Sequence, residues 1–214
     1  MDTLAKPRSR KSGRGEPVRD ALIRAGQSLF SLHPVDAVAV DDIVREAGVA
    51  KGSFYKHFPD KEALLDAVVQ QIFARIEREV DETNAEVADA AARVARAICV
   101  YLRFVAGQPQ QGGVLVRNHR SGWTLAAVEL NQGTVADIRR GLLAGRFVVP
   151  TVEAGALIVQ GVAHAGLARF TGAPGATPNI ATAQHLCQLV LAALGVPAAE
   201  ADRISTEAAE AILA

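Results

Sequence analysis

Apolar residues recur along most of this chain at intervals of three and four positions, the spacing of one face of an α-helix. Val18, Leu22, Ala25 and Leu29 begin the pattern after Pro17, and His33-Pro34 ends this first helix. We find no alternating strands, paired hairpin turns or internal repeats. The spacing predicts an all-α chain, with loops at 107–113 and 118–122 and longer helices over residues 61–80, 87–106, 123–143 (interrupted only at Gly133), 151–170, 180–194 and 198–213.

Two short helices are expected between the first helix and residue 61. One begins near Asp41 and Asp42, whose charges suit the positive end of a helix, and Gly48 stops it after two turns. A second short helix follows at once and is bounded by Pro59, after which Asp60 can cap the helix over 61–80. Two short helices joined by a turn that contains glycine predict a helix-turn-helix.

The stretch VAKGSFYKHFPDKEALL, residues 49–65, gathers aromatic and basic side chains in a chain with only ten aromatic residues. Phe54 and Phe58 are four positions apart and should pack inside, whereas Tyr55 should point outward between Lys51 and Lys56. Lysines neutralise DNA phosphates, and hydroxyl groups bond phosphate oxygens. This pattern predicts a DNA-binding surface, although Tyr55 alone would also suit a half-buried core position.

Other members of this stretch fit the same surface but are less specific individually. Gly52 would let the helix backbone approach a groove closely, and the Ser53 hydroxyl can meet a phosphate. Lys61 stands in the first turn of the next helix, where a bound phosphate would offset its unfavourable position in the helix dipole. An ordinary exposed lysine at 61 and a structural or surface histidine at 57 are the alternatives.

The run VRDALIRAGQSLF…DDIVREAGVAKGSFYKHFPDKEALLDAVV, about residues 17–69, resembles the DNA-binding domain of the TetR family of bacterial transcription regulators. The resemblance implies a three-helix DNA-binding domain at 17–60 and a helical effector-binding and dimerisation domain at 61–214 whose helix 61–80 is the connector. Residues 1–16 are expected to be a disordered basic arm, because of their charge. The family usually has Ser or Thr where this chain has Ala39 and Ala50, which removes two hydroxyl caps. By position, the residues that would meet DNA are Lys51, Gly52, Ser53, Tyr55, Lys56 and His57, with Lys61 at a phosphate.

The helices near the C-terminus point to self-association. Apolar residues flank the helix over 180–194 on two sides, and the helix before it is rich in glycine and alanine, which permit close helix approach. The resemblance implies a homodimer through helices at about 151–171 and 178–195. The alternative is that both helices fill the core of a monomer.

The resemblance also implies a small-molecule effector bound in the second domain, and we expect an apolar or aromatic one. Candidate contacts combine stacking and polar groups: Tyr101, Phe104, Arg117, Asn118, His119, Trp123 and His164. Core packing for Trp123, a solvated loop around 117–122 and a hydrogen-bonded core position for His164 are the alternatives. The expected function is a repressor released from a palindromic operator by its effector, the alternatives being an activator or a regulator controlled by a protein partner.

Charge and motifs exclude several other classes of protein. The formal net charge is zero, but residues 1–60 hold ten Lys and Arg against eight Asp and Glu, with five of the basic residues between 6 and 14. Such an arm is typical of nucleic-acid-binding tails, although a solubilising tail or a cloning remnant would look the same. No phosphate loop, catalytic motif or metal spacing is present, and no signal peptide or membrane span is expected. We therefore expect no enzyme, no metal and no cofactor, and a cytoplasmic protein whose Cys99 and Cys187 are free thiols.

Overall fold

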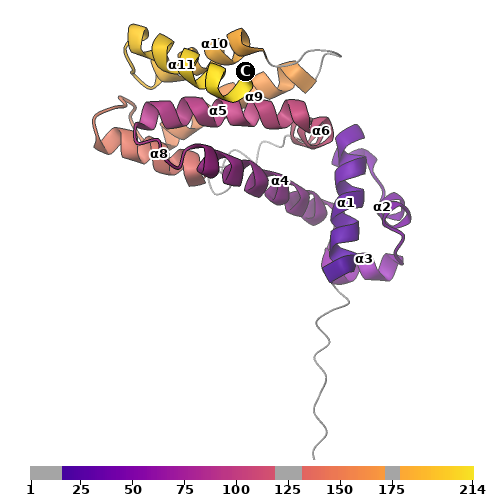
Figure 1. The fold of residues 1–214 in the computed structure, drawn as a ribbon. Coiled ribbons are helices and arrows are strands. Elements are labelled where there is room, and N and C mark those ends of the chain that lie inside the picture. The colour runs from indigo at the N-terminus through magenta and orange to yellow at the C-terminus, as the bar shows by residue number, and fades with distance from the viewer. Residues whose placement is uncertain (1–15, 119–131, 172–178) are drawn as a thin grey trace, which may run out of the picture.

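The computed structural model describes residues 16–118, 132–171 and 179–214, and every regular element within them is a helix (Figure 1). This confirms the predicted all-α class. Within the same residues, no helix is both long and apolar enough to cross a membrane.

The first four elements form a small unit, which we call the reading head. Its core is continuous, because side chains from all three α-helices are fully buried together: Leu22, Phe30, Ile43 and Phe54. Gly48 ends the second helix with a φ of 66°, a left-handed conformation that glycine adopts without strain. The elements are α1 (Glu16–Leu32), the 3₁₀ helix η1 (Val35–Ala37), α2 (Val40–Ala47) and α3 (Lys51–His57).

Helix α4 (Lys61–Thr83) leads from the reading head into the rest of the molecule (Figure 1). The Asp60 carboxylate caps it by accepting a hydrogen bond from the Ala63 N–H at 2.7 Å, as expected. The first turns of α4 bury Leu64 and Leu65 completely against the head. The connector is therefore packed into the head rather than merely attached to it.

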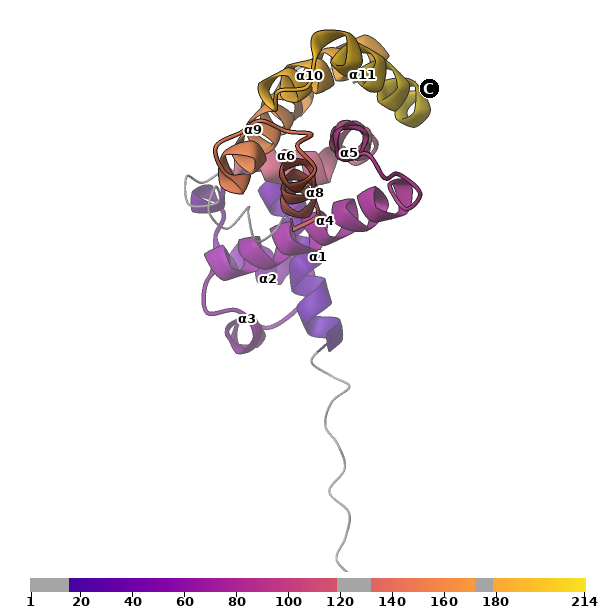
Figure 2. The same cartoon turned by 90° about the vertical axis from the view of Figure 1, so that its left-hand side faces the viewer.

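The larger, C-terminal part is built around α5 (Ala90–Gly107), which contacts α4 before it and all five of the described helices after it (Figure 2). Asp89 begins α5 by accepting a hydrogen bond from the Ala92 N–H, so the helix starts later than the sequence predicted. The thiols of Cys99 and Cys187 lie 3.7 Å apart where α5 meets α10, and both are buried and free. The later helices are α8 (Gln132–Leu143), α9 (Val152–Thr171), α10 (Ile180–Ala193) and α11 (Ala198–Leu213).

One predicted loop is wrong, because residues 109–117 form helix α6 (Pro109–Arg117). Two consecutive glycines, Gly112 and Gly113, indicated a loop, but both are buried and packing overrides their poor helix propensity. A β-carbon on Gly113 would lie 2.8 Å from the carbonyl oxygen of Ser31 in α1. The absence of a side chain at Gly113 therefore allows α6 to pack directly against the backbone of α1.

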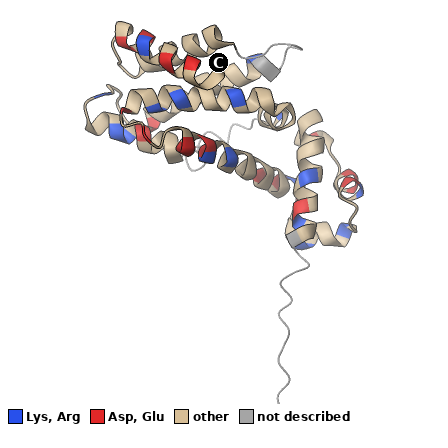
Figure 3. Ribbon diagram, viewed as in Figure 1, with Lys and Arg blue, Asp and Glu red and all other residues tan. Residues whose placement is uncertain are grey.

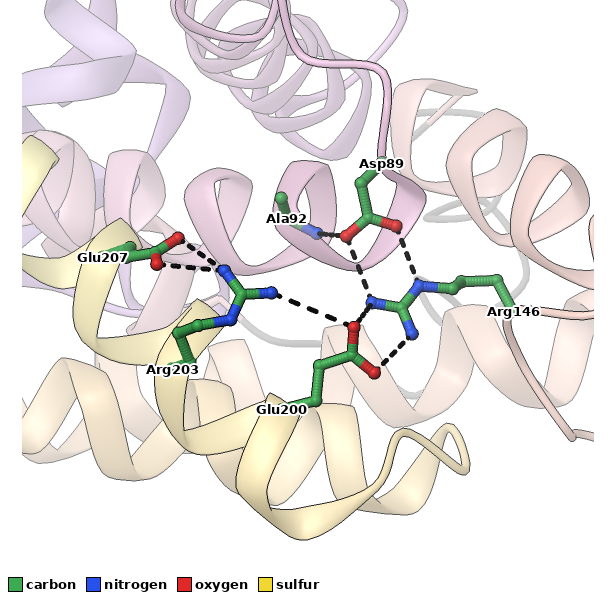
Figure 4. A network of polar contacts seen from close by, with 6 residues as sticks. All are labelled: Asp89, Ala92, Arg146, Glu200, Arg203 and Glu207. Carbon is green, nitrogen blue, oxygen red and sulfur yellow. Dashed lines mark hydrogen bonds and ion pairs between the residues drawn. The ribbon is translucent and has the colours of Figure 1, made fainter.

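An ion-pair network fixes the far end of the C-terminal part (Figure 4). The Arg146 guanidinium, between α8 and α9, donates to Asp89 at the start of α5 and to Glu200 in α11, with bonds from 2.8 to 3.3 Å. These hydrogen bonds lower the pKa of both carboxyl groups. Three elements that are distant in sequence are thereby tied together at the end opposite the reading head (Figures 1 and 4).

Candidate nucleic-acid interface

Helix α3 divides its aromatic residues between core and surface as the sequence predicted. Phe54 is fully buried and Phe58 nearly so, and their rings lie 6.0 Å apart. The ring of Tyr55 meets Phe54 edge to face at 5.3 Å, yet 54% of Tyr55 is exposed. The two phenylalanines thus anchor α3, and the phenol of Tyr55 is held at the surface with little freedom.

The remaining residues predicted on α3 lie on the same open side of the head. Gly52 and Lys56 are exposed, whereas Ser53 and His57 are partly exposed. Ala39 and Ala50 stand at the N-caps of α2 and α3 without a side-chain hydrogen bond, as their residue types require. The first N–H groups of α3 are consequently not covered by a capping side chain.

Lys51 is held by an acid from the neighbouring helix. Its ammonium nitrogen lies 2.8 Å from Oδ1 of Asp41, and this hydrogen bond, more than the charge attraction, raises the pKa of Lys51. Asp41 therefore pairs across the turn, and the N-cap of α2, Ala39, makes no side-chain hydrogen bond. Both partners are exposed, so the pair is weak, and a phosphate can take the place of the carboxylate.

Lys61 has a structural role in the protein without DNA. Its ammonium group donates to the backbone carbonyls of Asp36 and Val38, at 3.2 and 3.1 Å. An ammonium group has three donors, so one is left for the phosphate contact predicted from the sequence. In the protein without DNA, Lys61 therefore stabilises the connection between α1 and α2.

Two basic residues that sequence reasoning did not select also lie on the reading head. Arg45 of α2 is exposed and paired with Asp42 one turn earlier. Arg19 of α1 is exposed, with its guanidinium carbon 5.5 Å from the centre of the Phe58 ring. No local pattern could have found Arg19, because only the fold brings the start of α1 beside the end of α3.

Substitution of Gly52 by alanine tests whether α3 approaches DNA closely, because nothing in the protein lies within 4 Å of the β-carbon that an alanine would add. Gly52→Ala should keep or slightly raise the free energy of unfolding, since alanine favours a helix by up to about 1 kcal/mol over glycine. DNA affinity should fall about tenfold, because the methyl group separates α3 from the duplex and weakens its phosphate contacts. Fluorescence anisotropy with labelled duplex and thermal unfolding measure the two effects.

The matched control is Gly133→Ala. Gly133 is also the second residue of its helix, and its added β-carbon also meets nothing within 4 Å, but it lies in α8. Gly133→Ala should leave DNA affinity unchanged. Equal DNA affinity for Gly52→Ala and the unmodified protein would show that α3 does not approach the duplex closely.

The structure separates the predicted effector contacts into different environments. Tyr101 and His164 are partly buried, and burial raises the pKa of the Tyr101 phenol, so it stays neutral near pH 7. Phe104 is a core residue with the Arg75 guanidinium 5.3 Å from its ring, and Arg117 is exposed. Predictions for His119 and Trp123 lie outside the described residues.

Asn118 is placed differently from what the effector prediction assumed. It is 3% exposed, and its side-chain amide binds three backbone groups of the protein, in α6, at the end of α1 and at the start of η1. Both donors of the amide and one lone pair of its oxygen are engaged by the protein itself. Asn118 therefore belongs to the contact between the two parts of the chain.

Comparison with known proteins agrees with this geometry. Residues 22–68 match the family described as bacterial regulatory proteins, tetR family, and residues 61–207 match the tetracyclin repressor-like C-terminal domain. The second match alone covers more than half of the chain. The chain belongs to the TetR family. The first match contains α2 and α3 complete, and the second contains α5 to α10, so the family describes both the reading head and the larger part.

Individual TetR relatives match part of this chain. The HTH-type transcriptional repressor DhaR of Mycobacterium sp. (strain GP1) is 40% identical over 67 residues, covering 31% of this chain and 34% of DhaR. The regulator EthR of Mycolicibacterium smegmatis is 27% identical over 106 residues, covering 48% of this chain and 49% of EthR. The chain thus spans half or less of the length of these curated relatives.

Solved TetR-like structures resemble this chain over most of its length. RolR in complex with resorcinol superposes with a TM-score of 0.69 and 25% identity, covering 92% of this chain and 96% of RolR. FadR from Bacillus subtilis in complex with stearoyl-CoA has a TM-score of 0.67 but 18% identity, so it shows likeness of fold alone. The arrangement of a reading head on a larger helical body is therefore shared.

Proposed function

We propose that this protein is a dimeric transcriptional repressor that binds a near-palindromic operator in the cytoplasm and is released by a small-molecule effector. The observation that carries the proposal is the division of α3, with Phe54 and Phe58 buried and Tyr55 and Lys56 exposed. A buried aromatic anchor beneath an exposed basic face presents a rigid helix to a duplex. The proposed DNA contacts are Lys51, Gly52, Ser53, Tyr55, Lys56, His57 and Lys61, to which the structure adds Arg19 and Arg45.

Dimerisation is proposed through α9 and α10. Helix α10 contains no Lys, Arg, Asp or Glu, and α9 has charged residues only near its ends (Figure 3). Gly161 in the middle of α9 is exposed, and nothing lies within 4 Å of an added β-carbon, so packing within the protomer does not explain a residue that weakens the helix. Close approach of a second copy would explain it.

The effector is proposed to be apolar or aromatic and to bind in the C-terminal part. Its supporting observations are the RolR complex with resorcinol and the partly buried Tyr101, whose hydroxyl has no hydrogen-bond partner among the described residues. Because the phenol stays neutral, it can donate a hydrogen bond to a polar group of a ligand. His164 is the second proposed contact. Control by a protein partner, or activation in place of repression, is the alternative.

Selection of bound sequences from a random DNA pool tests the proposal. The unmodified protein should enrich an inverted repeat whose half-sites are about one helical turn apart. A Tyr55→Phe, Lys56→Ala variant run beside it should enrich nothing. If the unmodified protein also enriches nothing, with or without resorcinol in the buffer, the proposed DNA-binding function is wrong.

The basic arm should contribute to affinity through charge alone. Residues 16–60 hold five Lys and Arg against seven Asp and Glu, so the reading head without its arm is net negative. Residues 1–15 hold five Lys and Arg against one acid. Deleting residues 1–14 should weaken binding several-fold for every duplex and lower the slope of log affinity against log salt. Binding unchanged at every salt concentration would make the arm a passive tail.

A further inference from the structure

The connection between α1 and α2 leaves buried backbone groups that the reading head cannot satisfy by itself. In a continuing helix the Phe30 carbonyl would accept from residue 34, but residue 34 is proline and has no N–H. The N–H of Val35, at the start of η1, has no carbonyl of the head as its partner. Buried backbone groups without partners are strongly unfavourable, so both must be satisfied from elsewhere.

Asn118, at the C-cap of α6, satisfies both groups. Its Nδ2 donates to the Phe30 carbonyl at 2.9 Å and to the Val114 carbonyl at 3.1 Å, and its Oδ1 accepts from the Val35 N–H at 2.8 Å. One amide from the C-terminal part thereby closes the gap between the end of α1 and the start of η1. Asparagine fits this position because its side chain carries both a donor and an acceptor.

A second side chain holds the same connection from the opposite direction. Lys61, the first residue of α4, donates to the carbonyls of Asp36 and Val38. Four backbone groups between residues 30 and 38 are thus bound by Asn118 and Lys61 together. Helix α2 begins two residues beyond Val38, so the placement of η1 sets where α2, and with it α3, begins.

Helix α6 packs directly against the end of α1 at this contact. Gly113 lies against the Ser31 carbonyl so closely that even a methyl group would have no room. A shift of α6 therefore has two outcomes: α6 carries the end of α1 and η1 with it, or the hydrogen bonds of Asn118 break. A packed contact of this kind has discrete arrangements rather than a continuous range.

We propose that Asn118 is the positioning residue that couples the C-terminal part of the protein to the reading head, through η1. Its side chain holds η1 in the position that orients α3 for DNA binding. A displacement of α6 is transmitted to α3 through these hydrogen bonds. The regulatory role of these hydrogen bonds rests on the proposed function. The coupling of Asn118 to the position of η1 does not rest on that function, and it can be tested without DNA.

The decisive experiment measures a distance within one protomer. Spin labels are attached at Glu46→Cys on α2 and Glu210→Cys on α11, both exposed positions, while Cys99 and Cys187 are buried and should not react. Diluting labelled protein with excess unlabelled protein isolates the intramolecular distance, which pulsed electron resonance then reports. Asn118→Ala is compared with the otherwise identical protein.

The chain offers a matched control in Asn84→Ala. Asn84 is also a fully buried asparagine at a helix C-cap, and its side chain bonds Arg93 and Arg96 instead of the head. Both variants lose a buried amide, so both should melt at a lower temperature. Only Asn118→Ala should broaden or shift the distance, and it should bind the selected operator about tenfold more weakly than Asn84→Ala.

The outcomes are distinguishable. A distance distribution in Asn118→Ala that matches that of Asn84→Ala overturns the inference, whatever the DNA result. If the unmodified protein selects no DNA sequence but the distance changes in Asn118→Ala, the coupling through Asn118 is supported and the proposed function is refuted. If Asn118→Ala does not fold, Lys61→Met removes the bonds on the other side of η1 and should change the same distance. An unchanged distance in that variant also overturns the inference.

Discussion

Leu189→Glu should convert the protein into a folded monomer that binds its operator at least about a hundredfold more weakly. Leu189 is 62% exposed in the centre of α10, on a helix without a single charged residue. In a two-fold symmetric interface each substitution occurs twice, so two carboxylates would enter one apolar contact. Removing a carboxylate from water without a partner is strongly unfavourable, and the interface should not form.

The loss of DNA affinity follows from the loss of the second reading head. A dimer that has bound one half-site presents its other head to the second half-site at a high effective concentration, and a monomer has no such gain. Analytical ultracentrifugation gives the mass, and anisotropy gives the operator affinity. Leu143→Glu is the control: Leu143 is 85% exposed at the end of α8, so it should remain dimeric with unchanged affinity. A dimeric Leu189→Glu protein would place the interface elsewhere.

The reading head was predictable from sequence because its determinants are local. Gly48 ends α2, Asp60 begins α4, and the four-residue spacing of Phe54 and Phe58 assigns the two faces of α3. Each of these features depends on residues within one or two turns. The same reasoning identified Tyr55 as exposed, which the structure confirms.

The contact between the reading head and the C-terminal part was not predictable, because it depends on neighbours that are distant in sequence. Gly112 and Gly113 indicate a loop until Ser31 is known to lie against them. Asn118 looked like an effector contact because it follows Arg117 in a polar stretch, yet its partners Phe30 and Val35 are more than eighty residues away. Lys61 was predicted to contact a phosphate, and no local pattern indicated that its ammonium group also binds the backbone carbonyls of Asp36 and Val38.

These long-range contacts were missed for one physical reason. A polar side chain at a helix end can meet solvent, a ligand or an unsatisfied backbone group, and sequence alone does not reveal which backbone groups lack partners. Pro34 was the available signal, since a proline after a helix removes the N–H that the Phe30 carbonyl needs. That signal predicts that a partner must exist but not where in the chain it lies.

Tyr55→Phe combined with Lys56→Ala should weaken binding of the dimer to every DNA sequence about a thousandfold, which is about thirtyfold for each of its two reading heads, while leaving the fold and the dimer intact. Tyr55 and Lys56 are both exposed, and the aromatic ring of residue 55 that packs on Phe54 is retained. The substitutions remove one hydroxyl and one cation from the DNA-facing surface, each worth about 1 kcal/mol in a phosphate contact. Because one cation is lost from each of the two reading heads on the operator, the slope of log affinity against log salt should decrease by about two.

The control for this variant uses the only other tyrosine in the chain. Tyr101→Phe with Arg139→Ala likewise removes one hydroxyl and one positive charge, but in the C-terminal part, at a partly buried phenol and an exposed cation of α8. It should bind the operator as the unmodified protein does, with an unchanged salt slope. A loss of affinity equal to that of the Tyr55 and Lys56 variant would mean that lost charge and stability, not contacts made by α3, explain the effect. A normal affinity for the Tyr55 and Lys56 variant would instead move the DNA-binding surface away from α3, towards Arg19, Arg45 and the basic arm.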